Sequence, residues 1–194
     1  MTLKFLPVAT GLFALTLLTA CGTETVKKQD VQASVEEAKA AIELNNQDLY
    51  EVHHEGRIYV FDDHATYQEF LEVGETSFRK VFIGEGPKGE TIVFGLTNED
   101  KKKTSGIASM DMYHGDLAGA DVFYGEMRVE GRIYVFSSLE EMTTARTVGE
   151  VPLRYTDIGA GPKGETVVYA LNGDNKKVKP VAMIAAFRQI NGLN

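Results

Sequence analysis

The heptapeptide EGRIYVF occurs at residues 55–61 and again at residues 130–136, 75 positions later. The hexapeptide GPKGET at residues 86–91 recurs at residues 161–166 with the same offset, so both matches belong to one alignment without a gap. Self-similarity at a fixed period is the signature of a repeated structural unit. A period of 75 residues is too long for the common solenoid repeats, and it predicts a tandem duplication of a small α+β unit.

Each copy of the unit carries the same succession of strand patterns. In the first copy, residues 50–53 and 57–61 are short strand-like stretches on either side of Glu55-Gly56, which is a hairpin signal. A helical pattern follows them, and residues 79–83 and 91–96 then read as two further strands. We therefore predict two tandem β-β-α-β-β units with antiparallel sheets.

Residues suited to helix ends flank the predicted helix in both copies. Asp62-Asp63 precede it in the first copy and Ser137-Ser138 take their place in the second. Both residue types cap the free backbone N–H groups at a helix start, so we interpret the aspartates as caps. Gly74 and Gly149 follow the two helices, where glycine adopts a left-handed conformation without steric cost.

The loop GEGPKGET at residues 84–91 has the G-x-G-x-x-G spacing of a nucleotide-binding loop, with Lys88 inside it. A phosphate-binding loop needs a helix directly after its glycines, because free N–H groups and the helix dipole hold the anion. Here TIVFGL follows, and TVVYAL follows in the second copy, and these β-branched and aromatic residues favour a strand. The loop therefore predicts a turn between two strands.

Residues 1–20 have the features of a secretory signal peptide. A positive start precedes an apolar run over residues 5–19, which is too short to span a bilayer comfortably. The run ends in Leu18-Thr19-Ala20-Cys21, which resembles the lipobox of bacterial lipoproteins. That resemblance implies cleavage before Cys21 and acylation of this residue, which is the only cysteine in the chain. Gly22 replaces the aspartate typical of inner-membrane retention, which implies the outer membrane.

The remaining boundaries follow from composition and from the duplication. Residues 21–33 are polar and predict a flexible tether. Residues 34–48 begin with the capping-box pattern SVEE and continue with apolar residues at helical spacing, so we predict a helix there. The first repeat unit then covers residues 49–123 and the second covers residues 124–194.

A metal site is one alternative for the histidines of the first repeat. His53 and His54 lie next to the predicted hairpin turn, whereas Asp62, Asp63 and His64 lie about 15 Å away at about 3.3 Å per strand residue. That separation is too large for one coordination sphere, in which ligands lie near ~2 Å from the metal. At the positions of the three histidines the second repeat has Arg128, Val129 and Leu139. We assign no metal site and keep His53 and His54 as the alternative.

Other function classes find little support in the sequence. The net charge is −8 and no long basic run is present, which argues against nucleic acid as a partner. The chain has no G-x-S-x-G, no H-E-x-x-H and no cysteine nucleophile beyond the lipobox. We therefore predict no enzymatic activity and no cofactor.

The repeated strand RIYVF is apolar on both faces, whereas a strand with one solvated face alternates apolar and polar residues. One face carries Ile58 and Val60, and the helix of each unit can cover only one of the two faces. The other face and its copy form a candidate ligand-binding or inter-repeat face: Arg57, Tyr59, Phe61, Arg132, Tyr134 and Phe136. We expect this face to point away from the helix, and the two units to pack on each other through it as a pseudo-two-fold pair.

The stretch HEGRIYVFDDHATYQEFLE at residues 54–72 resembles YHS-type modules, in which a glycine-led aromatic strand precedes a short helix that carries a phenylalanine. The resemblance covers about 20 residues of each unit. The cysteines of the metal-handling members are absent from these residues, so the resemblance gives no support for a metal role and assigns no function.

Together these patterns predict an α+β protein that a lipid on Cys21 anchors to the outer membrane, on its periplasmic side. We expect a non-enzymatic binding or scaffolding module with a protein partner in the envelope. The alternative is a periplasmic metal-binding protein that uses His53 and His54.

Overall fold

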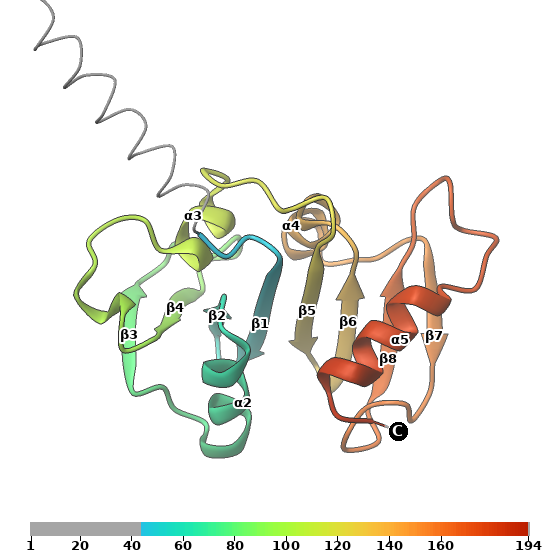
Figure 1. Cartoon of the computed structure of the whole chain (residues 1–194), viewed down its shortest axis with the longest axis horizontal. Helices are drawn as coiled ribbons and strands as arrows, with labels where there is room; N and C mark the ends of the chain where they lie inside the picture. Colours follow the sequence, from blue (N-terminus) through green and yellow to red (C-terminus); the bar gives the residue numbers. More distant parts are fainter. Residues whose placement is uncertain (1–43, 194) are drawn as a thin grey trace, which may run out of the picture. The chain divides into compact units, whose positions relative to one another are not determined.

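The computed structural model describes residues 44–193, which form one mixed sheet of eight strands with four α-helices (Figure 1). The strand order is β3-β4-β2-β1-β5-β6-β8-β7. The elements of the first repeat are β1 (Asp48–His54), β2 (Arg57–Phe61), α2 (His64–Val73), β3 (Phe78–Phe82), β4 (Thr91–Leu96), a 3-10 turn η1 (Asp100–Lys102) and α3 (Ala108–His114). Those of the second repeat are β5 (Tyr124–Val129), β6 (Arg132–Phe136), α4 (Leu139–Val148), β7 (Arg154–Asp157), β8 (Thr166–Ala170) and α5 (Val181–Ile190).

Both repeats have the same internal pairing. β1 and β2 are antiparallel, as are β3 and β4, but β2 and β4 run parallel. The equivalent strands of the second repeat pair in the same way. The prediction of purely antiparallel sheets is therefore wrong. A helix and an edge strand lie between β2 and β4 in the chain, and this long connection brings β4 back in the direction of β2.

The two repeats share one sheet and meet edge to edge. β1 pairs with β5 in parallel, with Tyr50 opposite Glu126 and Val52 opposite Arg128. The prediction that the units pack on each other through a strand face is therefore wrong. Within each repeat the first strand, β1 or β5, lies at one edge of the sheet and has backbone N–H and C=O groups without partners in its own repeat. Pairing β1 with β5 satisfies these groups.

The four helices cover both faces of the sheet. α2 and α5 pack on one face, called here the α2 face, where their apolar residues contact Tyr50, Phe61 and Val135. α3 and α4 pack on the opposite face, called the α4 face, around Leu49 and Phe136. Each repeat is therefore a β-β-α-β-β-α unit, and the equivalent helices α2 and α4 lie on opposite faces. A pseudo-two-fold axis that runs parallel to the strands, between β1 and β5, relates the two repeats and exchanges the two faces of the sheet.

Several local predictions are confirmed. Asp63 caps α2 by accepting a hydrogen bond from Thr66 N at 2.8 Å, and Ser138 caps α4 in the same way. Gly74 and Gly149 are left-handed, with φ of 79° and 83°. The glycine-rich loop is a turn between β3 and β4, as predicted.

Asp62 has a role that the sequence did not indicate. Its carboxylate is buried and accepts a hydrogen bond at 2.9 Å from the backbone N–H of Ser109, near the start of α3. The prediction that both aspartates cap the first helix is therefore wrong for Asp62, which instead ties α3 to the end of β2.

The signal peptide, Cys21 and the tether lie outside the described residues, as does most of the helix predicted at residues 34–48. Within that range, residues 44–47 are not helical and β1 begins at Asp48. Among the described residues, no helix has the length and apolar character needed to cross a membrane.

Candidate functional site

The candidate aromatic face is mostly buried within each repeat. Tyr59 is 7% exposed and Phe61 is fully buried, and both pack under α2. The ring of Phe70 lies 4.4 Å from that of Tyr59 and 5.3 Å from that of Phe61, between centroids. Phe136 is also buried, in the core on the α4 face. The expectation that this face points away from the helix is wrong, because the helix of each repeat packs on the larger, aromatic side of the strand and α3 covers Ile58 and Val60.

The remaining members of that set lie at the surface. Arg57 is exposed and donates a hydrogen bond to Tyr59 Oη at 3.3 Å. Arg132 is exposed, whereas its neighbour Tyr134 is half-buried. Tyr134 and Tyr59 occupy equivalent positions in the two repeats, so their difference in burial marks a place where the repeats diverge.

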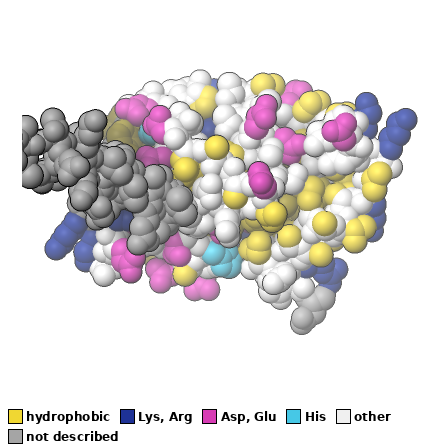
Figure 2. All heavy atoms as spheres, turned by 45° about the horizontal axis from the view of Figure 1, so that its top comes forward, with side chains coloured by type: hydrophobic (Ala, Val, Ile, Leu, Met, Phe, Trp, Pro, Cys, Tyr) yellow, Lys and Arg dark blue, Asp and Glu magenta, His cyan; other side chains and the backbone are white. Residues whose placement is uncertain are grey.

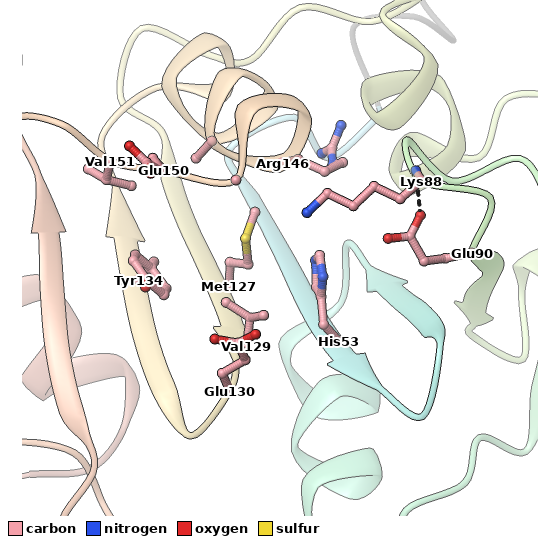
Figure 3. Close-up of a pocket in the computed structure, with 12 residues that line it drawn as sticks. His53, Lys88, Glu90, Met127, Val129, Glu130, Tyr134, Arg146, Glu150 and Val151 are labelled. Atoms are coloured by element: carbon pink, nitrogen blue, oxygen red, sulfur yellow. Dashed lines mark hydrogen bonds between the residues drawn. The ribbon is translucent and has the colours of Figure 1, made fainter.

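A pocket of about 120 Å³, called here the junction pocket, lies on the α4 face where the two repeats meet (Figure 3). One wall comes from the first repeat, through the end of β1 and the glycine-rich loop. The other wall comes from β5, β6 and the end of α4. The lining residues are His53, Lys88, Glu90, Met127, Val129, Glu130, Tyr134, Ala145, Arg146, Gly149, Glu150 and Val151.

Each of these residues has an equivalent 75 positions away, and those equivalents lie on the α2 face. We call that second location the sister site. Several positions differ in size: Met127 and Arg146 of the junction pocket are larger than their equivalents Val52 and Leu71, and two other positions are smaller. Phe70 of the sister site corresponds to Ala145 in the junction pocket, and Arg128 corresponds to His53. The junction pocket therefore lacks the phenyl ring of Phe70, while Arg146 brings a guanidinium group that has no counterpart at Leu71.

The guanidinium group in the sister site is held by a dense polar network. Arg128 pairs with buried Glu126 at 2.9 Å and with Glu165 at 3.1 Å. It also donates to Tyr67 Oη at 2.6 Å and to Asn191 Oδ1 at 3.3 Å. Burial raises the pKa of Tyr67 well above its usual value, and the adjacent Glu126 raises it further, so the phenol stays protonated. The polar groups around Arg128 are thus paired, and a hollow of about 190 Å³ lies beside them, lined in part by Val52, His54, Arg128 and Glu165.

A buried ion pair between the repeats involves Arg146, one of the residues that line the junction pocket. Glu51 of β1 is fully buried and accepts two hydrogen bonds from Arg146 of α4, one of them from Nε at 2.8 Å. Its other carboxylate oxygen lies 3.4 Å from His53 Nε2. Burial alone would raise the pKa of Glu51, but Arg146 and His53 hold that pKa below its usual value. Glu51 is therefore an anion matched by Arg146.

Lys88 and Glu90 form the wall of the pocket that the glycine-rich loop supplies. Figure 3 shows the Lys88 side chain extending across the pocket towards the end of α4. A Cβ atom on Gly149 would lie 3.4 Å from Lys88 Nζ, so the ammonium group stands at the C-terminus of that helix, where cations are favoured. Glu90 turns one oxygen back to its own loop, accepting from Lys88 N at 2.7 Å.

The structure separates the histidines considered as metal ligands. His53 is half-buried in the junction pocket, whereas His54, the next residue of β1, points to the opposite face and is exposed. His64 lies at the start of α2 against Tyr50, with 5.5 Å between ring centroids. Residues 44–193 contain no group of three or more His, Cys, Asp or Glu placed to hold a metal ion.

The junction pocket continues into a shallow groove across β6, β8 and β7 of about 580 Å³. The two hollows share Glu130, Tyr134, Gly149, Glu150 and Val151. The groove adds a polar lining from Arg132, Arg154, Thr156 and Thr166, and apolar contributions from Ile158 and Val168. Arg132 and Tyr134, which the sequence singled out, therefore lie in one continuous hollow.

Sequence reasoning missed Met127, Ala145 and Arg146, and it considered Lys88 only as part of a turn. A signal for these residues was present. Aligning the repeats at an offset of 75 places Ala145 against Phe70, which removes bulk, and places Met127 and Arg146 against Val52 and Leu71, which adds it.

A second apolar surface lies over α5, in the half of the molecule that holds the second repeat (Figure 2). Ala182, Met183, Ala186 and Ile190 of α5 line a groove there together with exposed Val122. This groove carries few polar groups, in contrast to the junction pocket.

In comparisons with known proteins, no family model, no curated protein and no solved structure matches this chain.

Proposed function

We propose that the protein is a non-enzymatic binding or scaffolding module of the bacterial envelope, anchored to the outer membrane by a lipid on Cys21 and facing the periplasm. The anchor rests on the lipobox-like Leu18-Thr19-Ala20-Cys21 and on the apolar run before it. In this proposal the described domain holds its partner at the junction pocket and the adjoining groove.

The observation that carries the binding role is the divergence of the two repeats. Strand pairing, helix length and helix caps coincide in both, yet Tyr59 of the sister site is buried under Phe70, whereas its equivalent Tyr134 is half-buried beside Ala145 in the junction pocket. Overpacking and empty space both reduce stability, so stability alone favours filled sites. A hollow retained at the junction of the repeats supports a binding role.

Site-specific photo-crosslinking in cells tests the binding role. A photoreactive amino acid replaces Glu150, which is exposed at the rim of the junction pocket, and in a matched variant it replaces Glu75, its equivalent at the sister site. We expect one discrete envelope adduct from position 150 and none from position 75. Equal labelling from both positions, or no adduct from either, would refute the assigned surface.

The anchor is tested separately. Cys21→Ser is expected to leave unprocessed precursor and to abolish palmitate labelling. Gly22→Asp is expected to move the protein towards the inner membrane in a host that uses aspartate for retention. If the leader of the Cys21→Ser protein is cleaved and the protein still partitions into detergent, the lipid anchor is contradicted.

A further inference from the structure

We propose that the junction pocket receives one aromatic side chain from a polypeptide partner, in the position that Phe70 occupies in the sister site. This inference rests on the proposed binding role and names the chemistry of the bound group. The sister site serves as an internal template, since it shows which groups fit on this backbone.

The template is valid because the two backbones match around the site. Tyr50 pairs with Phe61 in the first repeat, and Gly125 pairs with Phe136 at the equivalent places in the second. The parallel pairs are also equivalent, with Arg57 opposite Thr91 in the first repeat and the same register 75 residues later. α2 and α4 each have 10 residues, with an N-cap side chain and a left-handed glycine at equivalent positions.

Tyr134 lacks the ring neighbour that its equivalent has. In the sister site Phe70 lies 4.4 Å from Tyr59, between ring centroids, and leaves Tyr59 only 7% exposed. In the junction pocket Ala145 stands in place of Phe70, and Tyr134 is half-buried. Aromatic pairs favour centroid separations of about 4.5–7 Å. A ring entering above Tyr134 therefore restores a contact that the other repeat already makes.

The pocket has the size and the walls for one ring. Its volume is about 120 Å³, and an apolar cavity of about 150 Å³ is known to accept benzene. Met127 contributes a polarisable thioether, which contacts aromatic rings favourably. Tyr134, Val129 and Val151 supply further apolar surface.

The charges at the pocket do not select a strongly charged group. Glu51 is matched by Arg146 in the buried ion pair. Lys88 and Glu90 contribute one charge of each sign on the loop wall, so these four groups sum to zero. Glu130 and Glu150 are exposed at the rim. With Glu130 and Glu150 the six groups carry a net charge of −2, which disfavours an anionic side chain and leaves the ring itself to the apolar part of the lining.

The adjoining groove indicates a polypeptide as the source of the ring. A single ring leaves the groove of about 580 Å³ unfilled. Its side chains of Arg132, Thr156 and Thr166 offer hydrogen-bond donors and acceptors along the sheet. Residues on either side of an inserted aromatic side chain can occupy this groove, which is the usual anatomy of an aromatic anchor with a polar surround.

The test uses the full-length protein in detergent, with carbon-13 labels on the methionine methyl groups. The probes are capped pentapeptides Gly-Gly-X-Gly-Gly in which X is phenylalanine or leucine, together with phenol as a free ring. We expect the phenylalanine peptide to shift the Met127 methyl resonance upfield, because that methyl lies beside the inserted ring. We expect at least a fivefold weaker response from the leucine peptide and from phenol.

Two variants locate the effect. Ala145→Phe places the sister-site ring inside the pocket, and it is expected to raise the melting temperature and to weaken peptide binding at least tenfold. Thr147→Phe adds the same ring on an exposed position of the same helix and should leave binding unchanged. If Ala145→Phe lowers the melting temperature instead, a second variant, Tyr134→Leu, removes the ring partner. It must then weaken binding of the phenylalanine peptide more than binding of the leucine peptide.

The outcomes distinguish this inference from the proposed function. A discrete crosslink from position 150 combined with equal responses to phenylalanine and leucine would overturn the aromatic assignment and keep the binding role. Phenol binding as tight as the phenylalanine peptide would overturn the polypeptide source. Absence of the position-150 crosslink would count against the proposed function itself, whatever the peptides do.

Discussion

Arg146→Met is expected to destabilise the protein by about 3–5 kcal/mol at pH 7, because it leaves a buried carboxylate without its counter-ion. Glu51 has no exposed surface and the Arg146 side chain is 3% exposed, so water cannot replace the lost partner. Methionine keeps an apolar stem of similar length in the same place. Total stabilities of domains are about 5–15 kcal/mol, so this single change removes a large share.

The destabilisation caused by Arg146→Met is expected to decrease as the pH falls. In the native protein the pKa of Glu51 is lowered, so its contribution to stability is present above the unfolded pKa and is lost as the pH falls through the folded pKa. Without Arg146, burial raises the pKa of Glu51, and the variant gains stability relative to the native protein as the carboxylate takes up a proton. The difference between the two proteins is therefore expected to be largest near pH 7 and to shrink towards pH 4.

Urea unfolding of both proteins at several pH values measures this difference. Arg79→Met is the matched control, because Arg79 forms an exposed ion pair with Glu75 at 2.8 Å and such pairs contribute about 0–1 kcal/mol. The double variant Glu51→Gln/Arg146→Met is expected to recover much of the loss, since no charge remains buried. A cost below about 1 kcal/mol for Arg146→Met, or a cost that does not change between pH 7 and pH 4, would refute the reasoning.

Four further substitutions test other parts of the fold. Burial raises the pKa of Asp62 to about 6, so the native state gains stability as the pH falls through that value. Asp62→Asn is therefore expected to stabilise the protein by up to about 3 kcal/mol at pH 7 and to have little effect at pH 4. Urea unfolding at the two pH values measures both effects. Asp63→Ala and Ser138→Ala each remove an N-cap and are expected to cost about 1 kcal/mol, and a cost near zero by thermal melting would contradict the capping role. Gly95→Ala would bring a Cβ atom 2.2 Å from the Phe61 ring and is expected to cost about 1–3 kcal/mol, whereas an unchanged melting temperature would show that the ring moves freely.

Local structure was predictable from the sequence because local residues determine it. The hairpin signal at Glu55-Gly56 predicted the β1–β2 pair, and Asp63 and Gly74 marked the ends of α2. The two apolar faces of RIYVF correctly predicted that both sides of the strand need cover, and α2 and α3 supply that cover. The apolar stretch at residues 181–190 forms α5, a second helix of the repeat that was not predicted.

The arrangement of the two repeats was not predictable in the same way. The constant offset between the repeats indicates that the two units share a fold. It does not indicate how the units are arranged, because a shared sheet and a face-to-face pair both bury the same apolar residues. The deciding contact is the β1–β5 pairing, which is made by backbone groups of residues 48–52 and 124–128 that any sequence carries. The buried glutamates Glu51 and Glu126 occupy equivalent positions and read as surface residues of a strand, because their partners Arg146 and Tyr67 come from the opposite repeat.

The pairing of β1 with β5 also bears on assembly at high concentration. The two strand edges that meet belong to equivalent units, so the β1 edge of one molecule matches the β5 edge of another as well as its own. The chain between residues 97 and 123 keeps the two edges of one molecule close, and a short tether gives an effective concentration on the order of millimolar. The proposed lipid anchor on Cys21 would hold many copies on one membrane and raise their local concentration towards that range. Exchange of repeats between neighbours then yields a domain-swapped dimer with the same strand order and the same buried ion pairs.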